Sequence, residues 1–254
     1  NVAGETQAST YSLGVGNRSM LLGAEIQNPV CKEDSIKLTF KATNLDGQPV
    51  SVEGNYKLYP VVGGAKSEEV MKGTPAYTGT FVSNKETLLP GWTSVPSGEY
   101  LLVMSAKDDQ GREVTGEEEV ILFSIKDKRP PVDKAIWYYA ENTSFDAAHP
   151  AVFYFGTSKK DAYVMMNLFS GNRMLESKVL RLSDSIERFE YPYKESYGNG
   201  LSATFCFVKD GSVNQQTVRM TKRLPDKTLT MKWEVFRDKL RPGQEEEWKL
   251  TVKT

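Results

Sequence analysis

The sequence predicts an all-β protein made of consecutive antiparallel β-sandwiches. Apolar and polar side chains alternate with a period of two in many short runs, and Gly, Pro, Asn and Asp separate these runs. No segment sustains helical periodicity over several turns, and only residues 184–189 are compatible with a single helical turn. Short strands punctuated by turn residues are typical of immunoglobulin-like and fibronectin-type III sandwiches.

The individual strands follow from this alternation. Residues 36–43 and 100–106 each place apolar side chains at every second position. Residues 162–168 are dense in apolar side chains and lead through a turn at 170–173 into the alternating run 174–182. This arrangement predicts a β-hairpin.

The composition is that of a soluble globular protein with a substantial core. The chain has 254 residues, of which 39% are hydrophobic and 26% charged, enough for one large or two ordinary domains. A net charge of −1 gives no electrostatic basis for binding nucleic acid or an anionic membrane, and no apolar run approaches membrane-spanning length. We expect the chain to be part of a longer protein, so its lack of a signal peptide does not indicate the cytoplasm.

Internal repeats divide the chain. A strand, an Asp-containing turn with a glycine and a returning strand occur at residues 100–125 and 201–220, and the second half of this unit recurs at the N-terminus. A second unit, consisting of a strand, an irregular segment and a strand, recurs at residues 24–43, 135–158 and 231–254. The opening unit is thus present once more than the complete closing unit.

The repeats predict a tandem array of sandwiches. Residues 1–16 are expected to be the end strand of a preceding domain, and residues 17–127 and 132–223 to form two complete sandwiches. The charged, proline-bearing segment 126–131 is the expected linker between them. Residues 227–254 are expected to be the opening strands of a following domain.

The order of the motifs resembles the macroglobulin-like domains of the alpha-2-macroglobulin family, and the bacterial branch fits best. The motifs that carry this resemblance are "PSGEY" (96–100), "DDQG" (108–111), "NLDGQPV" (44–50) and "LRPGQEEEW" (240–248). The chain departs from the family pattern at Leu240 and Leu201, where tyrosine is expected, and at His149-Pro150, where Pro-Gly is usual. The resemblance covers most of the chain, although each motif alone has low specificity.

This resemblance implies a function for the longer protein. Members of the family are endopeptidase inhibitors that trap proteases after a bait segment is cut, in some cases through a reactive thioester. The resemblance therefore implies a non-catalytic scaffold segment without cofactor, in the periplasm or at the cell surface. Its expected partners are neighbouring domains of the parent chain and, through the parent, proteases; neither nucleic acid nor a membrane is expected to bind this segment.

Cys31-Lys32-Glu33-Asp34 comes close to the thioester motif Cys-x-Glu-Gln. A thioester forms when the cysteine sulfur attacks a glutamine side-chain amide and expels ammonia. Asp34 supplies a shorter side chain with a carboxylate, which is a poor acyl donor. We therefore expect no thioester at Cys31.

No other residue predicts a catalytic, cofactor-binding or metal-binding site. Cys206, within "TFCFV", is expected to be a buried strand residue, and the two cysteines fall in different expected domains. His149 is the only histidine, which removes any His-based triad or multi-histidine metal site, and it is expected in a loop. The acidic runs 117–119 and 245–247 are expected to form solvated faces rather than cation sites.

Aromatic and polar residues mark structural positions. Alternation sends Trp137 and Tyr139 to one face of a strand and Tyr138 to the other, which favours burial of at least one face over a sugar-stacking surface. Tyr100 is expected to be the tyrosine of a sandwich corner. Asn17 and Asn142 begin glycosylation sequons, which matter only in a eukaryotic secretory setting.

The C-terminal residues predict two strands, within 229–252, around a turn at 241–243. Their expected apolar faces consist of Met231, Trp233 and Val235 on the first strand and Trp248, Leu250 and Val252 on the second. We expect this surface to pack against the preceding sandwich or against a second copy of the chain, because burial of two tryptophans is strongly favourable.

Two other functions are compatible with tandem sandwiches. One is a surface adhesin or glycan-binding array, and the other is a set of accessory domains of an extracellular hydrolase. A Cys-x-Glu-Gln motif further along the parent chain would favour the protease trap. An exposed row of coplanar aromatic side chains on these domains would favour glycan binding.

Overall fold

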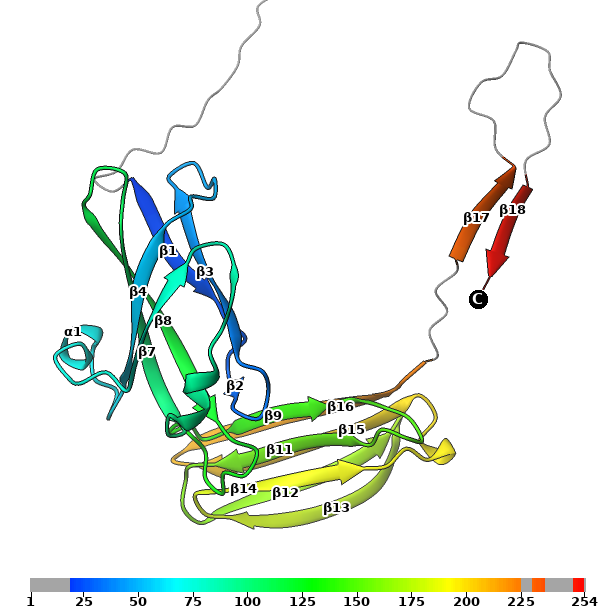
Figure 1. The fold of residues 1–254 in the computed structure, drawn as a ribbon. Coiled ribbons are helices and arrows are strands. Elements are labelled where there is room, and N and C mark those ends of the chain that lie inside the picture. Colours follow the sequence, from blue (N-terminus) through cyan, green and yellow to red (C-terminus); the bar gives the residue numbers. More distant parts are fainter. Residues whose placement is uncertain (1–18, 225–229, 236–248, 254) are drawn as a thin grey trace, which may run out of the picture.

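The computed structural model describes residues 19–224, 230–235 and 249–253, which form two β-sandwiches and a short hairpin (Figure 1). The all-β fold class is therefore confirmed. Residues 1–16, predicted to be the end strand of a preceding domain, lie outside the described residues.

The first sandwich contains two sheets, ordered β1-β3-β6 and β2-β8-β7-β4-β5. Its strands are β1 (Met20–Glu25), β2 (Val30–Cys31), β3 (Lys37–Asn44), β4 (Glu53–Pro60), β5 (Tyr77–Val82), β6 (Glu86–Leu88), β7 (Gly98–Lys107) and β8 (Glu113–Phe123). Neighbouring strands are antiparallel except β2 and β8, which are parallel.

The second sandwich also contains two sheets, ordered β9-β11-β14 and β10-β16-β15-β12-β13. Its strands are β9 (Trp137–Asn142), β10 (Ser144–Phe145), β11 (Ala151–Thr157), β12 (Ala162–Ser170), β13 (Arg173–Leu182), β14 (Ser185–Tyr191), β15 (Gly200–Lys209) and β16 (Ser212–Lys222). Here the parallel pair is β10 and β16.

The two sandwiches have the same topology. Adding eight to each strand number of the first sandwich reproduces the strand order of the second in both sheets. In each sandwich the first two strands belong to different sheets. β1 and β9 join the three-stranded sheet, whereas β2 and β10 join the five-stranded sheet. The repeated sequence units thus correspond to repeated folding units.

Each sandwich has its own core, built by the predicted alternation. In the first, Leu38 and Phe40 of β3 are buried together with Trp92 and Leu102. In the second, the largest buried side chains are aromatic: Phe153, Phe155 and Phe205 pack together, and the Phe155 and Phe205 rings stack at 4.1 Å. Burial of these apolar faces is the main stabilising contribution in sandwiches of this kind.

Residues 184–189 do not form a helical turn; most of them belong to β14. Phe189 pairs with Phe153 across the sheet, and the two rings stack at 5.1 Å with an angle of 12° between their planes. Cross-strand packing therefore decides the conformation of a segment whose local pattern is ambiguous.

The helical segments are short and lie in connections. The helix α1 (Ser67–Val70), between β4 and β5, belongs to a buried cluster that also contains Tyr59 and Leu101 (Figure 1). The 3-10 turns η1 (Pro90–Ser94) and η2 (Glu195–Tyr197) lie in equivalent connections, before β7 and β15.

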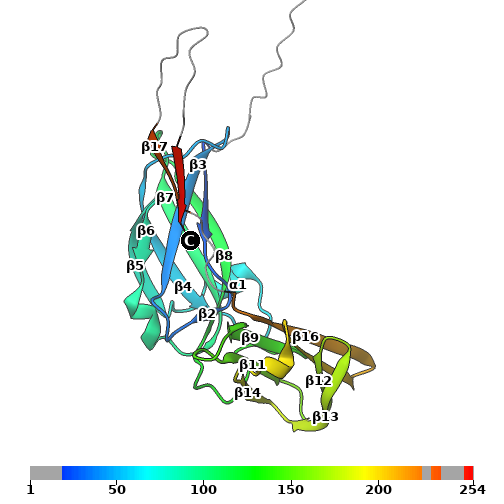
Figure 2. The same ribbon diagram turned by 90° about the vertical axis from the view of Figure 1, so that its right-hand side faces the viewer.

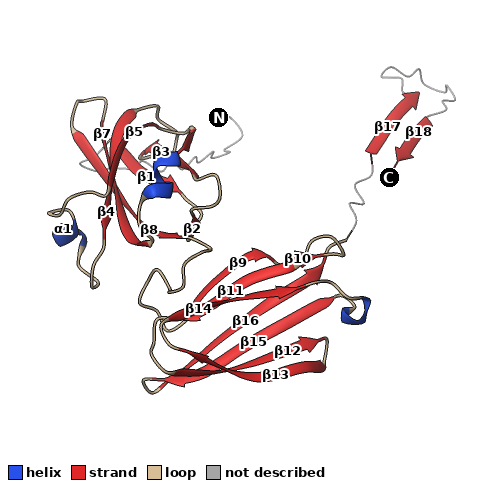
Figure 3. Cartoon of the chain, turned by 60° about the horizontal axis from the view of Figure 1, so that its bottom comes forward, coloured by secondary structure: helices blue, strands red, loops and turns tan. Residues whose placement is uncertain are grey.

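The predicted C-terminal strands are present as β17 (Thr230–Val235) and β18 (Lys249–Lys253), which pair antiparallel (Figure 3). Met231 lies opposite Val252, but its side chain is 65% exposed, so the expected burial of this face is not found at Met231. The predicted turn at 241–243 and Trp248 lie outside the described residues.

Candidate functional site: the junction between the two sandwiches

The end of the first sandwich meets the outer face of the three-stranded sheet of the second (Figures 1 and 2). A buried apolar cluster, here called the junction cluster, joins the two. It contains Cys31 and Phe123 from the first sandwich, and Trp137, Val152 and Tyr154 from the second. It also contains Val132 from the connection between β8 and β9 (residues 124–136), which is the linker in the structure. Ile121, Ile125, Tyr139 and Ile186 are partly buried against it.

The sequences of β9 and β11 explain why this sheet has two apolar faces. On β9, Tyr138 packs on the core of the second sandwich, while Trp137 and Tyr139 turn to the junction. Every residue of β11 (Ala151–Thr157) is buried, because one face lies in the core and the other in the junction. A continuous apolar run is what a strand covered on both faces requires.

Three aromatic contacts hold the junction cluster together. The Phe123 ring meets Trp137 at 5.3 Å and Tyr139 at 4.5 Å, with interplanar angles of 70° and 61°. Tyr139 in turn lies 6.2 Å from Tyr154 within the second sandwich. Edge-to-face contacts have a preferred geometry, so this cluster fixes orientation as well as excluding water.

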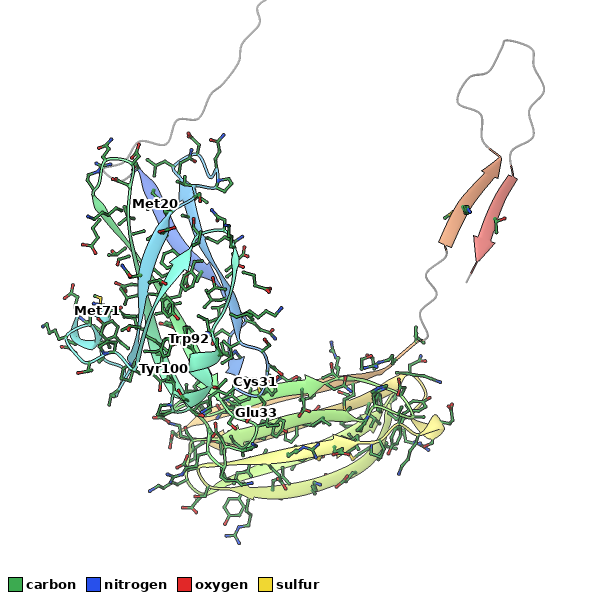
Figure 4. All side chains as sticks on the ribbon, in the orientation of Figure 1. Met20, Cys31, Glu33, Met71, Trp92 and Tyr100 are labelled. Carbon is green, nitrogen blue, oxygen red and sulfur yellow. The ribbon has the colours of Figure 1, made fainter. Side chains whose placement is uncertain are left out.

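Glu33 ties the end of the first sandwich to the start of the linker. Its Oε2 accepts a hydrogen bond from the Ile125 backbone N–H at 3.1 Å, and its Oε1 accepts one from the Ser124 hydroxyl. Burial alone would raise the pKa of Glu33, but these hydrogen bonds outweigh burial and lower it below its ordinary value. The carboxylate is therefore ionised at neutral pH and holds the chain where it leaves β8 (Figure 4).

The rest of the linker is held to the second sandwich. The Lys128 carbonyl accepts a hydrogen bond from the Ile186 backbone N–H at 3.0 Å. Arg129 forms an ion pair with Asp184 at 2.8 Å, and Ser158 donates through its hydroxyl to Asp133 at 2.6 Å. The linker is thus held to both sandwiches by hydrogen bonds and an ion pair, and its Val132 packs within the junction cluster.

Cys31 is a buried free thiol within the junction cluster. Its Sγ lies 3.4 Å from Glu33 Oε2, and burial raises the pKa of the thiol above its ordinary value. Burial also raises the pKa of the adjacent Tyr139, and the neighbouring Cys31 raises it further. A protonated, enclosed thiol is a poor nucleophile, and the geometry gives Cys31 a packing role.

The structure corrects the expectation for Cys206. Phe205 and Phe207 on β15 are buried, and Cys206 between them turns outward and is only half-buried. The motif "TFCFV" has apolar residues on both faces, so its composition does not reveal the direction of the cysteine. His149 lies in the loop before Pro150, as expected, with its Nδ1 2.9 Å from Asp146 Oδ1.

The first acidic run does not form a single solvated face. Glu117 and Glu119 on β8 are exposed, whereas Glu118 is half-buried because its position turns inward towards β1, near Gly23. The second run, 245–247, lies outside the described residues. Within residues 19–224 and the two C-terminal strands, no group of three or more His, Cys, Asp or Glu side chains could hold a metal ion.

Tyr100 forms the predicted tyrosine corner, since its hydroxyl donates to the Pro96 carbonyl at 2.8 Å. Leu201 occupies the equivalent place in the second sandwich and has no such hydroxyl. Of the two sequon asparagines, Asn17 lies outside the described residues. The Asn142 amide donates to the Pro150 carbonyl and accepts from the Ser144 N–H, so it serves a turn.

Several junction residues escaped sequence reasoning, namely Glu33 as an anchor and Phe123, Val152 and Tyr154 as contacts. The available signal was the uninterrupted apolar run of β11, which an exposed three-stranded sheet would not need. Among the helices of the described chain, none is long and apolar enough to cross a membrane.

The fold and the junction define a class of protein: tandem immunoglobulin-like β-sandwiches packed against each other through a shared apolar cluster. No protein-family model and no curated protein matches the sequence. Solved structures similar to the chain include the native alpha-2-macroglobulin of E. coli, with 13% identity over 93% of this chain and a TM-score of 0.32. Another is a Salmonella alpha-2-macroglobulin reacted with methylamine, with 15% identity over 97% of this chain and a TM-score of 0.32.

The chain spans 20% and 19% of the length of these two alpha-2-macroglobulins. A tetra-tandem repeat from the extending region of a large adhesion protein is also similar, with 13% identity, a TM-score of 0.27 and coverage of 85% of this chain and 51% of that one.

Proposed function

We propose that this chain is a non-catalytic scaffold segment of an alpha-2-macroglobulin-like endopeptidase inhibitor. Its two sandwiches would hold other parts of the longer protein at a fixed distance and angle. The observation that carries the scaffold role is the junction, which combines a buried apolar cluster with hydrogen bonds from the linker to both sandwiches.

The inhibitor role rests on the sequence motifs and on how they are used in the fold. The "PSGEY" motif forms the tyrosine corner at Tyr100, and "DDQG" forms the turn between β7 and β8. In this proposal the sandwiches are macroglobulin-like domains, residues 1–16 and 227–254 belong to their neighbours, and the parent protein acts in the periplasm or at the cell surface.

The alternative, a glycan-binding array, needs exposed aromatic side chains in a row. The aromatic run of β9 does not provide one, because Tyr138 packs on a core and Trp137 and Tyr139 lie in the junction. The aromatic run of β9 therefore gives no support to glycan binding by these domains.

The parent protein provides the test. Incubated with an endopeptidase, it should be cut in a limited way and then retain the protease in a complex isolated by size-exclusion chromatography. A parent that carries Phe123→Ala and Trp137→Ala should retain less protease if the junction sets the geometry of the trap. A parent that leaves the protease free, or one that binds glycans instead, would contradict the proposal.

A further inference from the structure

The second sandwich exposes a group of apolar side chains on the outer face of its five-stranded sheet. This group, here called the outer patch, consists of Tyr163, Met165, Val179, Val208 and Val213, which are between 51% and 71% exposed. Met165 lies opposite Val179 on β13, and Val208 lies opposite Val213 on β16. Because β13, β12, β15 and β16 are successive neighbours, the patch crosses four strands.

The first sandwich shows that the fold does not require these apolar residues. The buried pair Tyr100 and Val120 in β7 and β8 corresponds to the buried pair Leu201 and Met220 in β15 and β16. Counting seven residue pairs along each hairpin from these buried pairs leads to a second pair of matched positions. The first sandwich has Lys107 opposite Glu113 there, and the second sandwich has Val208 opposite Val213.

The same comparison extends to the neighbouring strands. Asn55 pairs with Thr80 and Ser105 in the first sandwich, as Met165 pairs with Val179 and Cys206 in the second. The five patch positions therefore hold only polar or charged residues in the first sandwich. These residues are Glu53, Asn55, Thr80, Lys107 and Glu113, and all of them are exposed.

Such a difference at matched positions points to binding. Single exposed apolar residues are ordinary, but a contiguous group on one sheet face marks an interaction surface. The junction with the first sandwich uses the opposite sheet, so it leaves the outer patch uncovered.

The charges around the outer patch indicate the chemistry of the partner. Among the outward positions of β12, β13, β15 and β16, the charged residues are Arg181 and Arg219, and none is a carboxylate. The adjoining turns and strand ends add Lys160 and Lys209 but also Asp161 and Asp210, so the net positive charge of this face comes from the two arginines. The Arg181 guanidinium donates to the Tyr163 hydroxyl at 2.9 Å and lies 5.1 Å from the centre of its ring. This contact holds a cation beside exposed apolar surface.

We propose that the outer patch docks another protein surface, one with apolar side chains flanked by carboxylates. A second copy of the same face would bring the arginines of both copies together, which opposes self-association. An anionic membrane is also a poorer match, because surfaces that bind one through charge carry clusters of about four to eight basic residues. The proposal is independent of the protease-inhibitor assignment.

The test uses the full chain and two synthetic peptides, one alternating Glu with Leu or Tyr and one with Lys in place of every Glu. Side-chain NMR should show saturable shifts of the Met165, Val208 and Val213 methyl groups with the Glu peptide and none with the Lys peptide. Arg181→Glu should weaken binding about tenfold, the loss expected for one charged hydrogen bond.

A matched control carries Met165→Asn, Val208→Lys and Val213→Glu, the residues that the first sandwich has at these positions. It should fold normally, with unchanged methyl shifts for the buried Leu201, and it should lose the peptide response. Equal binding of the Glu peptide to this control, or no saturable binding to the original chain, would overturn the proposal. Dimerisation in sedimentation, or binding to phosphatidylglycerol vesicles, that the control abolishes would also overturn it.

Discussion

Cys31 and Glu33 occupy the first and third positions of a thioester-like motif, but the fold gives them other roles. Cys31 is buried in the junction cluster, and Glu33 anchors Ser124 and Ile125 at the start of the linker. The motif lacks the glutamine that a thioester needs, because Asp34 stands in its place. The absence of a thioester is a prediction from this chemistry, whereas the anchoring role of Glu33 is visible only in the structure.

The chain should therefore carry no internal thioester. Mass spectrometry of the intact chain is expected to show the full mass of a free thiol at Cys31, and treatment with methylamine should add no mass. Alkylation of the unfolded chain should modify both Cys31 and Cys206, and Cys206, which is half-buried on an outer face, serves as the reference thiol. A methylamine adduct within residues 31–34 would contradict this account.

Asp108 fixes the turn between β7 and β8 and ties it to the start of β1. Its carboxylate accepts hydrogen bonds from the Arg112 and Gln110 backbone N–H groups, from the Arg112 guanidinium and from the Ser19 hydroxyl, at 2.8–2.9 Å. Burial alone would raise the pKa of Asp108, but these bonds lower it to about 2. The ordinary unfolded value is about 3.9.

This lowered pKa predicts a specific loss of stability in acid. Since the folded state favours the ionised form, Asp108 stabilises the first sandwich above about pH 4, and the contribution disappears as the pH falls towards 2. Urea unfolding should therefore show a destabilised Asp108→Asn variant at pH 7 whose difference from the original chain shrinks by pH 3. Asp109→Asn is the matched control and should change little, because Asp109 is exposed and an asparagine oxygen can still accept its hydrogen bond from the Ser19 hydroxyl. A difference that is constant with pH would refute the assignment.

At the scale of single elements, β11 and β14 show why local patterns mislead. Strict alternation identified strands with one apolar face, such as β3 and β15. It could not reveal that β11 is covered on both faces, or that residues 185–189 pair with β11 instead of forming a helical turn. In both cases the deciding contact comes from a distant part of the chain.

The tyrosine corner at the start of β7 provides an element-scale test. Tyr100→Phe keeps the buried ring but removes the hydrogen bond to the Pro96 carbonyl, so unfolding should become easier by about 1 kcal/mol. Denaturant unfolding measures the change. The control is Tyr138→Phe, because Tyr138 is a half-buried tyrosine of the second sandwich whose hydroxyl forms no hydrogen bond with the described residues. No effect of Tyr100→Phe, or an equal effect of both variants, would show that the corner adds no stability.

At the scale of the whole molecule, the sequence predicted two consecutive sandwich units but not how they meet. Repeats and alternation depend on short-range patterns and are visible in one sequence. The junction depends on which outer face is covered, and Trp137 or Phe123 would satisfy the same alternation on an exposed surface. The outer patch escaped notice for the same reason, because exposure is a property of the assembled fold.

The central claim is that the junction holds the two sandwiches in one relative orientation. Spin labels at Thr78→Cys in β5 and Ser177→Cys in β13, with Cys206→Ser to remove the half-buried thiol, report the distance between the sandwiches by double electron–electron resonance. Both label sites are exposed and lie away from the junction cluster. Tyr163→Ala is the control, because Tyr163 is exposed on the opposite sheet.

The account predicts a single narrow distance distribution that Tyr163→Ala leaves unchanged and that Phe123→Ala combined with Trp137→Ala broadens. A broad distance distribution in the labelled chain with its junction unaltered would contradict this account. So would a narrow distribution that the double variant leaves unchanged.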